Sequence, residues 1–368
     1  MANVALQAGG TLAYNGTYAS KILLEPMFHS DDIMRNYTIY PNVKYKQNIV
    51  MAPSLSSITA VNDGCTAVNA NCDPAGFTVT QKQIVVSNVA VKQTQCWAEF
   101  KDSVIVESYR NGVNMPDLTG TQLAQVIIDR VREGIKSDMV RNMWAGDTAA
   151  GVIAIDCTYD SMGDGLWVKL SAGNAINGTQ LREVQGTLGA ANAAYITVGA
   201  TLPAADAILL LEDVFNTASA ALAQVPASEK RIFCTPNVYN AWYSALTQVA
   251  SAGAVDYGHS EAQTGKARLY FRGVELVPMY EWDSALTALA GATFPALFTA
   301  ATAAIDATAG CIYVAKENLL IGTDVSSPEN EMKMFYDEIT DKMYIRAGFT
   351  MGFQYGWNAL VNGSMLVD

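Results

Sequence analysis

The sequence predicts an α+β protein organised around a long β-hairpin, and three observations support that class. Two apolar runs, 332–338 and 343–357, flank a short polar turn, which is typical of a β-hairpin. Apolar residues recur at helical spacing over 119–145 and indicate one long amphipathic helix. Helical and strand patterns then alternate over 201–278. With 368 residues, of which 50% are hydrophobic, the chain has ample material for a core.

The first 95 residues predict an arm followed by an extended loop. Residues 1–45 lack sustained periodicity but carry aromatic side chains, which favours an arm that packs on another body, such as a neighbouring chain. Residues 46–95 alternate in part between apolar and polar side chains, as β-strands do. Turn-forming residues gather between 64 and 76, so we expect a hairpin with a long irregular tip.

The helix over 119–145 has a recognisable start, stripe and end. Thr119 and Gln122 fit a capping box, and Gly146 closes the helix. Its apolar stripe recurs at every fourth position and comprises Leu123, Ile127, Val131, Ile135, Met139 and Met143. Such a helix would be roughly 38 Å long. The stripe alone is equally typical of an ordinary core-facing helix in any α+β protein.

The middle of the chain reads as a mixed domain. Residues 201–203 cap a second helix whose apolar face comprises Ile208, Leu211, Phe215 and Leu222. Residues 230–234 predict a buried strand, and Thr235-Pro236 opens a third helix. Residues 269–278 predict a strand pair joined by a turn at Gly273. The strand of the terminal hairpin after the turn would reach roughly 45 Å, which suits an extended plate better than a compact globule.

The terminal segment also resembles a known family. Residues 316–324 read Lys-Glu-Asn-Leu-Leu-Ile-Gly-Thr-Asp, and a strand and a charged turn lead to Tyr-Ile-Arg-Ala-Gly-Phe at 344–349. This order resembles the C-terminal signature of tailed-bacteriophage major capsid proteins with the Hong Kong 97 (HK97-like) fold. The resemblance covers most of residues 115–368, is weak over 1–60, and finds no match for 147–200.

The resemblance implies a division of the chain into named parts. It implies an N-terminal arm at 1–45 and an extended loop with flanking strands at 46–95. A peripheral domain at 96–200 would carry the spine helix at about 119–145. An axial domain would follow at 201–315, and 316–368 would form the return strands and long hairpin of the peripheral domain.

The resemblance further implies a structural role in a virion. Hexamers and pentamers of the chain would self-assemble, in the host cytoplasm, into an icosahedral shell around double-stranded DNA. The implied partners are portal, scaffold and decoration proteins, with the DNA enclosed without sequence-specific binding. The family places the tip of the terminal hairpin where three capsomers meet. Its charged residues are therefore candidate inter-subunit contacts, with a solvated hairpin end as the alternative: Glu338, Asp341, Lys342 and Arg346.

Composition agrees with an assembled protein. Only 16% of residues are charged, whereas about 25% is usual, so much of the surface is expected to be covered. The net charge of -12 disfavours a grip on nucleic acid, which relies on Lys and Arg. We expect no membrane span, since the least charged stretch, 285–305, contains Gly291 and Pro295 and reads as loop plus strand.

Catalytic and metal-binding patterns are scarce. The two histidines, His29 and His259, lie near no nucleophile motif, and phosphate-loop and dinucleotide fingerprints are absent from the sequence. Asp156, Asp160 and Asp164 are spaced too widely for a calcium loop and predict a solvated turn. We therefore expect no enzyme activity, no cofactor and no metal.

Two further features leave alternatives open. Most of the six cysteines sit in apolar runs and are expected to be buried free thiols, while Cys65 and Cys72 share a polar loop where a disulfide is the alternative. Some capsids of this fold form Lys–Asn cross-links. Lysines near the loop and asparagines near the C-terminus are common surface residues, so no cross-link site is assigned to them: Lys44, Lys46, Lys82, Asn358 and Asn362.

The alternative functions are an encapsulin-type shell protein of a cellular nanocompartment and, with less support, a β-rich adhesin or enzyme.

Overall fold

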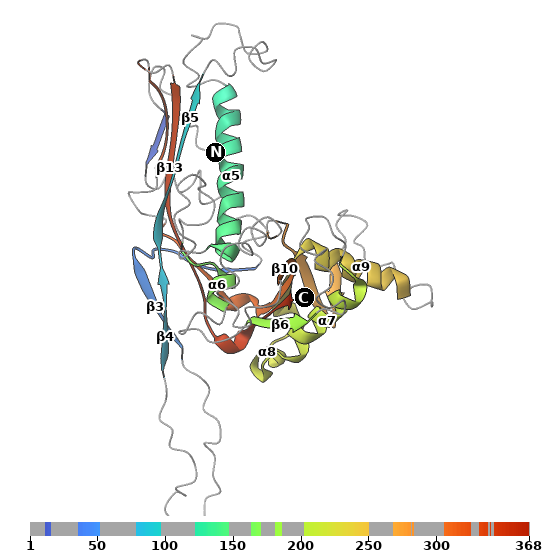
Figure 1. The fold of residues 1–368 in the computed structure, drawn as a ribbon. Helices are drawn as coiled ribbons and strands as arrows, with labels where there is room; N and C mark the ends of the chain where they lie inside the picture. The colour runs from blue at the N-terminus through green and yellow to red at the C-terminus, as the bar shows by residue number, and fades with distance from the viewer. Residues whose placement is uncertain are drawn as a thin grey trace, which may run out of the picture.

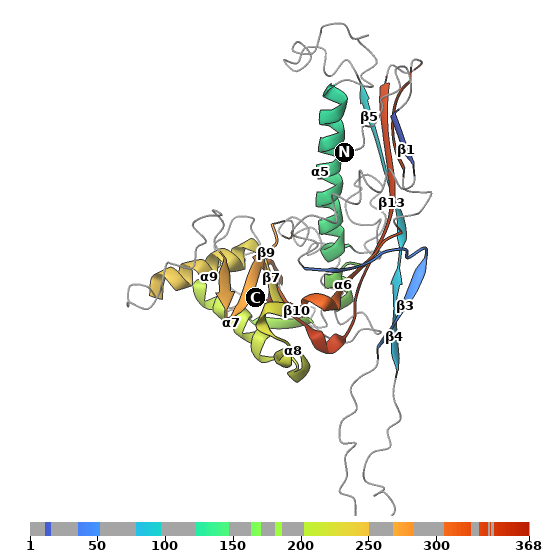
Figure 2. The ribbon, with the colours of Figure 1, turned by 180° about the vertical axis from the view of Figure 1, so that it is seen from behind.

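The protein consists of a long plate of strands lined by one helix, a second body beside it, and a hairpin that continues beyond the plate (Figures 1 and 2). The computed structural model describes residues 12–15, 36–51, 79–96, 122–146, 163–170, 181–185, 202–249, 268–280, 282, 305–324, 331–337, 339 and 342–367.

The plate is a six-stranded sheet arranged around one long strand. Its strands are β1 (Leu12–Asn15), β2 (Thr38–Tyr40), β5 (Ser87–Cys96), β11 (Leu319–Gly322), β12 (Glu331–Asp337) and β13 (Lys342–Tyr355). Strand β13 pairs antiparallel with β12 on one side and with β5 on the other, and its last four residues pair with β11. Asp337 lies opposite Lys342. The predicted terminal hairpin and its unusually long second strand are therefore confirmed.

One face of the plate is covered by helix α5 (Gln122–Ala145), which lies along β13 and β5 (Figure 1). Met343, Ile345, Ala347 and Phe349 alternate along β13 and share a core with the helix. The helix contributes residues at spacings of three and four to that core, namely Ile128, Val131, Ile135, Met139 and Met143. The predicted apolar stripe is thus the core face from Val131 to Met143, while the side chains of Leu123 and Ile127 lie outside the described part of the helix. Thr119, the predicted cap, lies outside the described residues.

The opposite side of α5 is polar, and its end is fixed by glycine. Exposed ion pairs join Arg130 to Glu133 at 2.8 Å along the outer face. A Cβ on Gly146 would approach the carbonyl oxygen of Gly163 to 2.5 Å, so only glycine fits there. The close approach lets the amide of Gly165 donate to the Gly146 carbonyl oxygen at 2.7 Å. Gly146 therefore ends the helix and docks it on the next segment.

The second body contains a six-stranded mixed sheet with the order β6-β14-β10-β7-β9-β8. Its strands are β6 (Leu181–Gln185), β7 (Lys230–Cys234), β8 (Leu269–Phe271), β9 (Val274–Pro278), β10 (Ile305–Ala315) and β14 (Val361–Val367). All five residues of β7 are buried, as the sequence predicts. The strand pair β8–β9 is also confirmed, with Gly273 in its turn at a φ of 83°.

Helices α7 (Ala204–Asn216) and α9 (Pro236–Val249) pack on one face of the second sheet. The described residues also form short helices: α6 (Leu166–Leu170), α8 (Ala220–Gln224), and the 3-10 turns η4 (Ala227–Glu229), η7 (Lys316–Asn318) and η8 (Asn358–Leu360). The prediction that Leu222 continues the face of the second helix is wrong. Helix α7 ends at Asn216, and Ser219 caps a new helix by accepting the amide of Leu222 at 3.1 Å.

An aromatic cluster joins the two bodies where α5 ends. The rings of Trp144 and Trp282 lie 4.9 Å apart between centroids, and those of Trp167 and Trp282 lie 5.0 Å apart. Trp144 also lies 4.9 Å from Phe233 of β7. Side chains along β10 alternate between the two faces of the second sheet. Cys311 and Tyr313 pack with α7 and α9 on one face, while Ile312 joins the core of the aromatic cluster on the other.

The strand pairing corrects two parts of the expected division of the chain. Residues 316–368 were expected together with the long hairpin, but β14 pairs with β10 and β6 in the second sheet. Residues 96–200 were likewise expected in one domain, but β6 lies parallel to β14 in that same sheet. The described residues of β14 from Val361 to Leu366 are buried, so the chain returns to the second body to complete its core.

The extended hairpin consists of β3 (Lys46–Met51) and β4 (Thr80–Val85), which pair antiparallel as a separate two-stranded ladder. It points away from the plate, in line with β5 (Figure 1). The irregular tip that the sequence predicts between these strands lies outside the described residues. The predicted antiparallel strands are present.

Candidate assembly surfaces

The extended hairpin carries apolar side chains that its own chain leaves exposed. Tyr45 is 67% exposed and Val50 is 61% exposed, and both belong to the β3 side of the hairpin. Val79 and Val85 are each 44% exposed on the β4 side. A two-stranded ribbon has little hydrophobic core of its own. Exposed apolar residues on such a ribbon are candidates for contact with another body.

The root of the hairpin is tightly seated on the plate. Ile84 and Val86 are buried with Val43 and Leu320 in a small separate core. A Cβ on Gly352 would lie 2.1 Å from the carbonyl oxygen of Val85, so β4 crosses β13 where only a glycine leaves room.

Polar contacts reinforce this root. Lys82 Nζ donates to Asn358 Oδ1 at 2.6 Å, and the amine lies 3.6 Å from the centroid of the Tyr355 ring. Gln354 Nε2 donates to the carbonyl oxygen of Gln83 at 3.1 Å. Sequence reasoning assigned no role to Lys82 or Asn358. Here the two residues meet within one chain, although 276 positions separate them.

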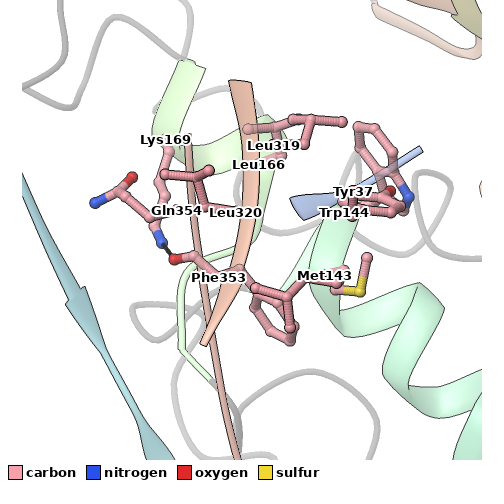
Figure 3. A pocket seen from close by; sticks show the side chains of 10 residues that line it. Tyr37, Met143, Trp144, Leu166, Lys169, Leu319, Leu320, Phe353 and Gln354 are labelled. Carbon is pink, nitrogen blue, oxygen red and sulfur yellow. Dashed lines mark hydrogen bonds between the residues drawn. The ribbon is translucent and has the colours of Figure 1, made fainter. Parts of the chain in front are cut away.

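A pocket lies beside this root, between the end of α5 and strands β11 and β13 (Figure 3). Its empty volume is about 290 Å³, counted with the open solvent at its mouth, and its lining is mostly apolar. Lys169 of α6 lines it and donates from Nζ to the carbonyl oxygen of Phe353 (Figure 3). Burial lowers the pKa of Lys169 to about 8. Lys169 is the one charged side chain among the described residues that line the pocket.

The tip of the β12–β13 hairpin is the surface predicted from its charges. Lys342 and Arg346 are exposed on the face of β13 opposite to α5, while Glu338 and Asp341 lie outside the described residues. Between them, Ile339 is 93% exposed, and its amide donates to Asp337 Oδ1 at 3.0 Å. This turn presents a large apolar side chain at the tip, which the charge pattern did not reveal.

Strand register places further cations beside Arg346. Lys333 of β12 and Lys92 of β5 are its direct neighbours across the two ladders. The rings of Phe335 and Tyr344, one pair nearer the tip, stack at 5.3 Å. The outer face of the plate therefore combines basic and aromatic side chains. Only the pairing of the strands reveals this grouping, because the residues come from three separate segments.

The remaining candidates from the sequence yield no chemistry among the described residues. His29, His259, Asp156, Asp160, Cys65 and Cys72 fall outside that part of the chain. Cys234 and Cys311 are fully buried free thiols, as predicted, and burial raises the pKa of both. Within the described ranges, no group of three or more metal-ligating side chains occurs, and no helix is long and apolar enough to cross a membrane.

Comparison with solved structures identifies the fold. A chain of the satellite phage P4 procapsid, a particle that includes the size determination (Sid) protein, aligns with a TM-score of 0.53 and 9% identity. The alignment covers 99% of this chain and 94% of that one. The protein therefore has the α+β fold of a phage capsid structure over nearly its whole length.

Other capsids align with lower scores. A capsid chain of a native GTA particle aligns with a TM-score of 0.45 at 13% identity, covering 99% of this chain and 95% of that one. The capsid of cyanophage P-SCSP1u gives 0.47 at 12% identity, covering 100% and 91%. No protein-family model matches the sequence, and no curated protein matches it.

Proposed function

We propose that this chain is the major capsid protein of a tailed bacteriophage, the structural subunit of an icosahedral head that encloses double-stranded DNA. The observation that carries the proposal is the likeness to the P4 procapsid chain, which spans 99% of this sequence and so includes the arm, hairpin, plate and second body together. The proposed role is structural, with no catalytic step.

The parts of the chain take the following roles in this proposal. The plate with α5 is the peripheral domain, the second body is the axial domain, and β3–β4 is the stem of the extended loop. Hexamers and pentamers of the chain form the shell. Portal, scaffold and decoration proteins are its proposed partners, and the host cytoplasm is its place of assembly.

The exposed hairpin supports this role on physical grounds. A shell subunit needs apolar surface that is exposed in the single chain and covered in the assembly. Tyr45 and Val50 meet that description, since both are more than 60% exposed on a ribbon that extends away from the main body. Closed symmetric packing would cover these side chains in every subunit.

The direct test is microscopy and sedimentation of the purified chain. We expect closed particles of uniform size in negative stain, together with a matching fast-sedimenting species. A chain that stays monomeric at high concentration, with no particles in any native preparation, would contradict the proposal.

A substitution on the hairpin tests the surface itself. Val50→Asp places a charge where the proposal requires apolar contact, so we expect loss of particles with the subunit still folded. Its unfolding free energy should change by less than about 0.5 kcal/mol, because the site is exposed in the single chain. Val50→Thr is the matched control of nearly the same shape and should still assemble. If Val50→Asp assembles as well as the parent, the hairpin is not an assembly surface.

A further inference from the structure

The extended hairpin is attached to the plate through the inward-facing residues of β4. Lys82, Ile84 and Val86 are buried, whereas Gln81, Gln83 and Val85 are exposed. After Val86 the chain leaves the ladder with β3 and enters β5, which pairs with β13. The contacts of these three inward residues therefore fix the angle between hairpin and plate.

Ile84 and Val86 make apolar contacts, whereas Lys82 makes its contact through its amine. Lys82 is 9% exposed, although it carries a charge in water. Its Nζ donates to Asn358 Oδ1 at 2.6 Å and lies over the Tyr355 ring. A buried lysine is costly in its charged form, while its neutral form can still donate this hydrogen bond.

Tyr355 also contacts a second lysine. The hydroxyl of Tyr355 donates to the carbonyl oxygen of Lys169 at 3.5 Å, and Lys169 Nζ donates to Phe353, two residues earlier on β13. Burial and the charge of Lys169 lower the pKa of Lys82 to about 7. Burial lowers the pKa of Lys169 to about 8, with Asp164 acting in the opposite direction. Both amines therefore change charge near neutral pH.

The other elements around Lys82 add little that titrates. Strand β3 brings Lys46, whose amine lies over its neighbour Tyr45 at 5.2 Å. Burial raises the pKa of Tyr355, so its hydroxyl stays protonated. Strand β11 and turn η8 contain no titratable side chain. The Tyr355 ring attracts a charged amine and so opposes the effect of burial on Lys82.

We propose that Lys82 is a pH-sensitive latch that seats the extended hairpin on the end of β13, closed while its amine is neutral and loosened when Lys82 and Lys169 are both charged. When the root opens, Lys82 reaches water, where its pKa returns to the ordinary value of 10.5. Protons therefore favour the open root. The closed root is most stable above that ordinary pKa and loses stability as the pH falls toward about 7.

The latch is a property of the single chain, and its bearing on assembly rests on the proposed function. Tyr45, Val50, Val79 and Val85 all lie on or beside the hairpin. A change in the angle of the root would move this whole apolar surface relative to the plate. A shell protein could thereby respond to a change of pH without any change in the surface itself.

Hydrogen exchange of the full, unassembled chain tests the latch. The measured quantity is the protection factor of the amides of residues 80–86, corrected for the intrinsic exchange rate. Residues 230–234 of β7 serve as the internal reference. The protection factor should fall roughly ten- to fifty-fold between pH 9 and pH 7. Lys82→Met should remove this fall. Lys82→Arg, whose side chain stays charged throughout, should also remove it and guards against a folding defect in the Met variant. Lys92→Met alters an exposed lysine of β5 and should behave like the parent.

Equal protection of residues 80–86 at both pH values in the parent would overturn the latch. The same result follows if Lys82→Met and Lys82→Arg keep the pH response of the parent. Because this readout comes from single chains, its failure leaves the shell role untouched, whereas a failure to form particles would leave the latch standing.

Discussion

Single glycines decide how closely the strands of this protein approach one another. Gly352 on β13 leaves room for the Val85 carbonyl oxygen, and Gly322 on β11 leaves room for the side chain of Ile84. Neither glycine has a positive φ, so each is needed for space and not for backbone conformation. Both act at the root of the extended hairpin, where β4 crosses two other strands.

Gly352→Ala should therefore dislodge the hairpin. The new Cβ would lie 2.1 Å from a backbone oxygen, which no rotamer change can relieve. We expect a loss of about 1–3 kcal/mol in unfolding free energy and faster hydrogen exchange over 80–86. Gly134→Ala is the matched control, because a Cβ there meets nothing within 4 Å on helix α5, and alanine should be neutral or slightly stabilising. Unchanged exchange at 80–86 in Gly352→Ala would show that β4 tolerates the displacement.

Residue-level prediction from the sequence succeeds where a residue's role follows from its neighbours in the chain. Cys234 and Cys311 lie in apolar runs, and both are buried free thiols. Lys82 shows the opposite case, since it sits in a polar stretch and is buried by Tyr355 and Asn358 from the far end of the chain. No local pattern can indicate such a contact.

At the scale of elements, the periodic segments were predictable and their pairing was not. Helix α5, strand β7 and the β12–β13 hairpin follow from local spacing of apolar residues. The parallel pairings of β2 with β11 and of β6 with β14 join segments far apart in sequence, so no local pattern specifies them. The same reason explains why residues 361–367 were assigned to the wrong body.

The Trp144 cluster is a contact between elements of the two bodies. Trp144 is 1% exposed and its ring contacts both Trp282 and Phe233. Trp144→Ala should lower the unfolding free energy in urea by about 3–5 kcal/mol. Tyr243→Ala, on an exposed position of α9, should change it by less than about 0.5 kcal/mol. If both variants unfold at the parent's urea concentration, the aromatic cluster contributes little to the junction.

For the whole molecule, the small free energies of surface contacts gain importance because every subunit of a shell makes the same contacts. An exposed ion pair contributes less than about 1 kcal/mol in one chain. The tip of β12–β13 carries mixed charge, with Lys342 exposed opposite Asp337. In the proposed shell such a tip meets its copies at many equivalent positions. The small ion-pair free energies therefore add up and together influence whether particles form.

Exchanging the charges at this tip should alter assembly and spare folding. We expect Asp341→Lys with Lys342→Glu to change the salt dependence of particle formation while the melting temperature stays nearly constant. The control exchanges Arg130 and Glu133, an exposed pair on the outer face of α5, and should leave both properties unchanged. If the tip variant assembles like the parent from low to high salt, the tip is not an interface.

The placement of β10, β13 and β14 has a consequence for how the protein is made. In each sheet, central strands come later in the chain than most of the strands that pair with them: β13 in the plate, and β10 with β14 in the second body. A nascent chain that has emerged only as far as β9 can pair β7, β9 and β8 with one another, but β1, β2, β5 and β6 still lack the strands with which they pair. Ribosomes add about 5–20 residues each second, and sheets built from distant segments form slowly. Neither sheet can be completed until residues 342–367 leave the ribosome, so the plate and the second body of a subunit still under synthesis offer neighbouring chains no finished surface.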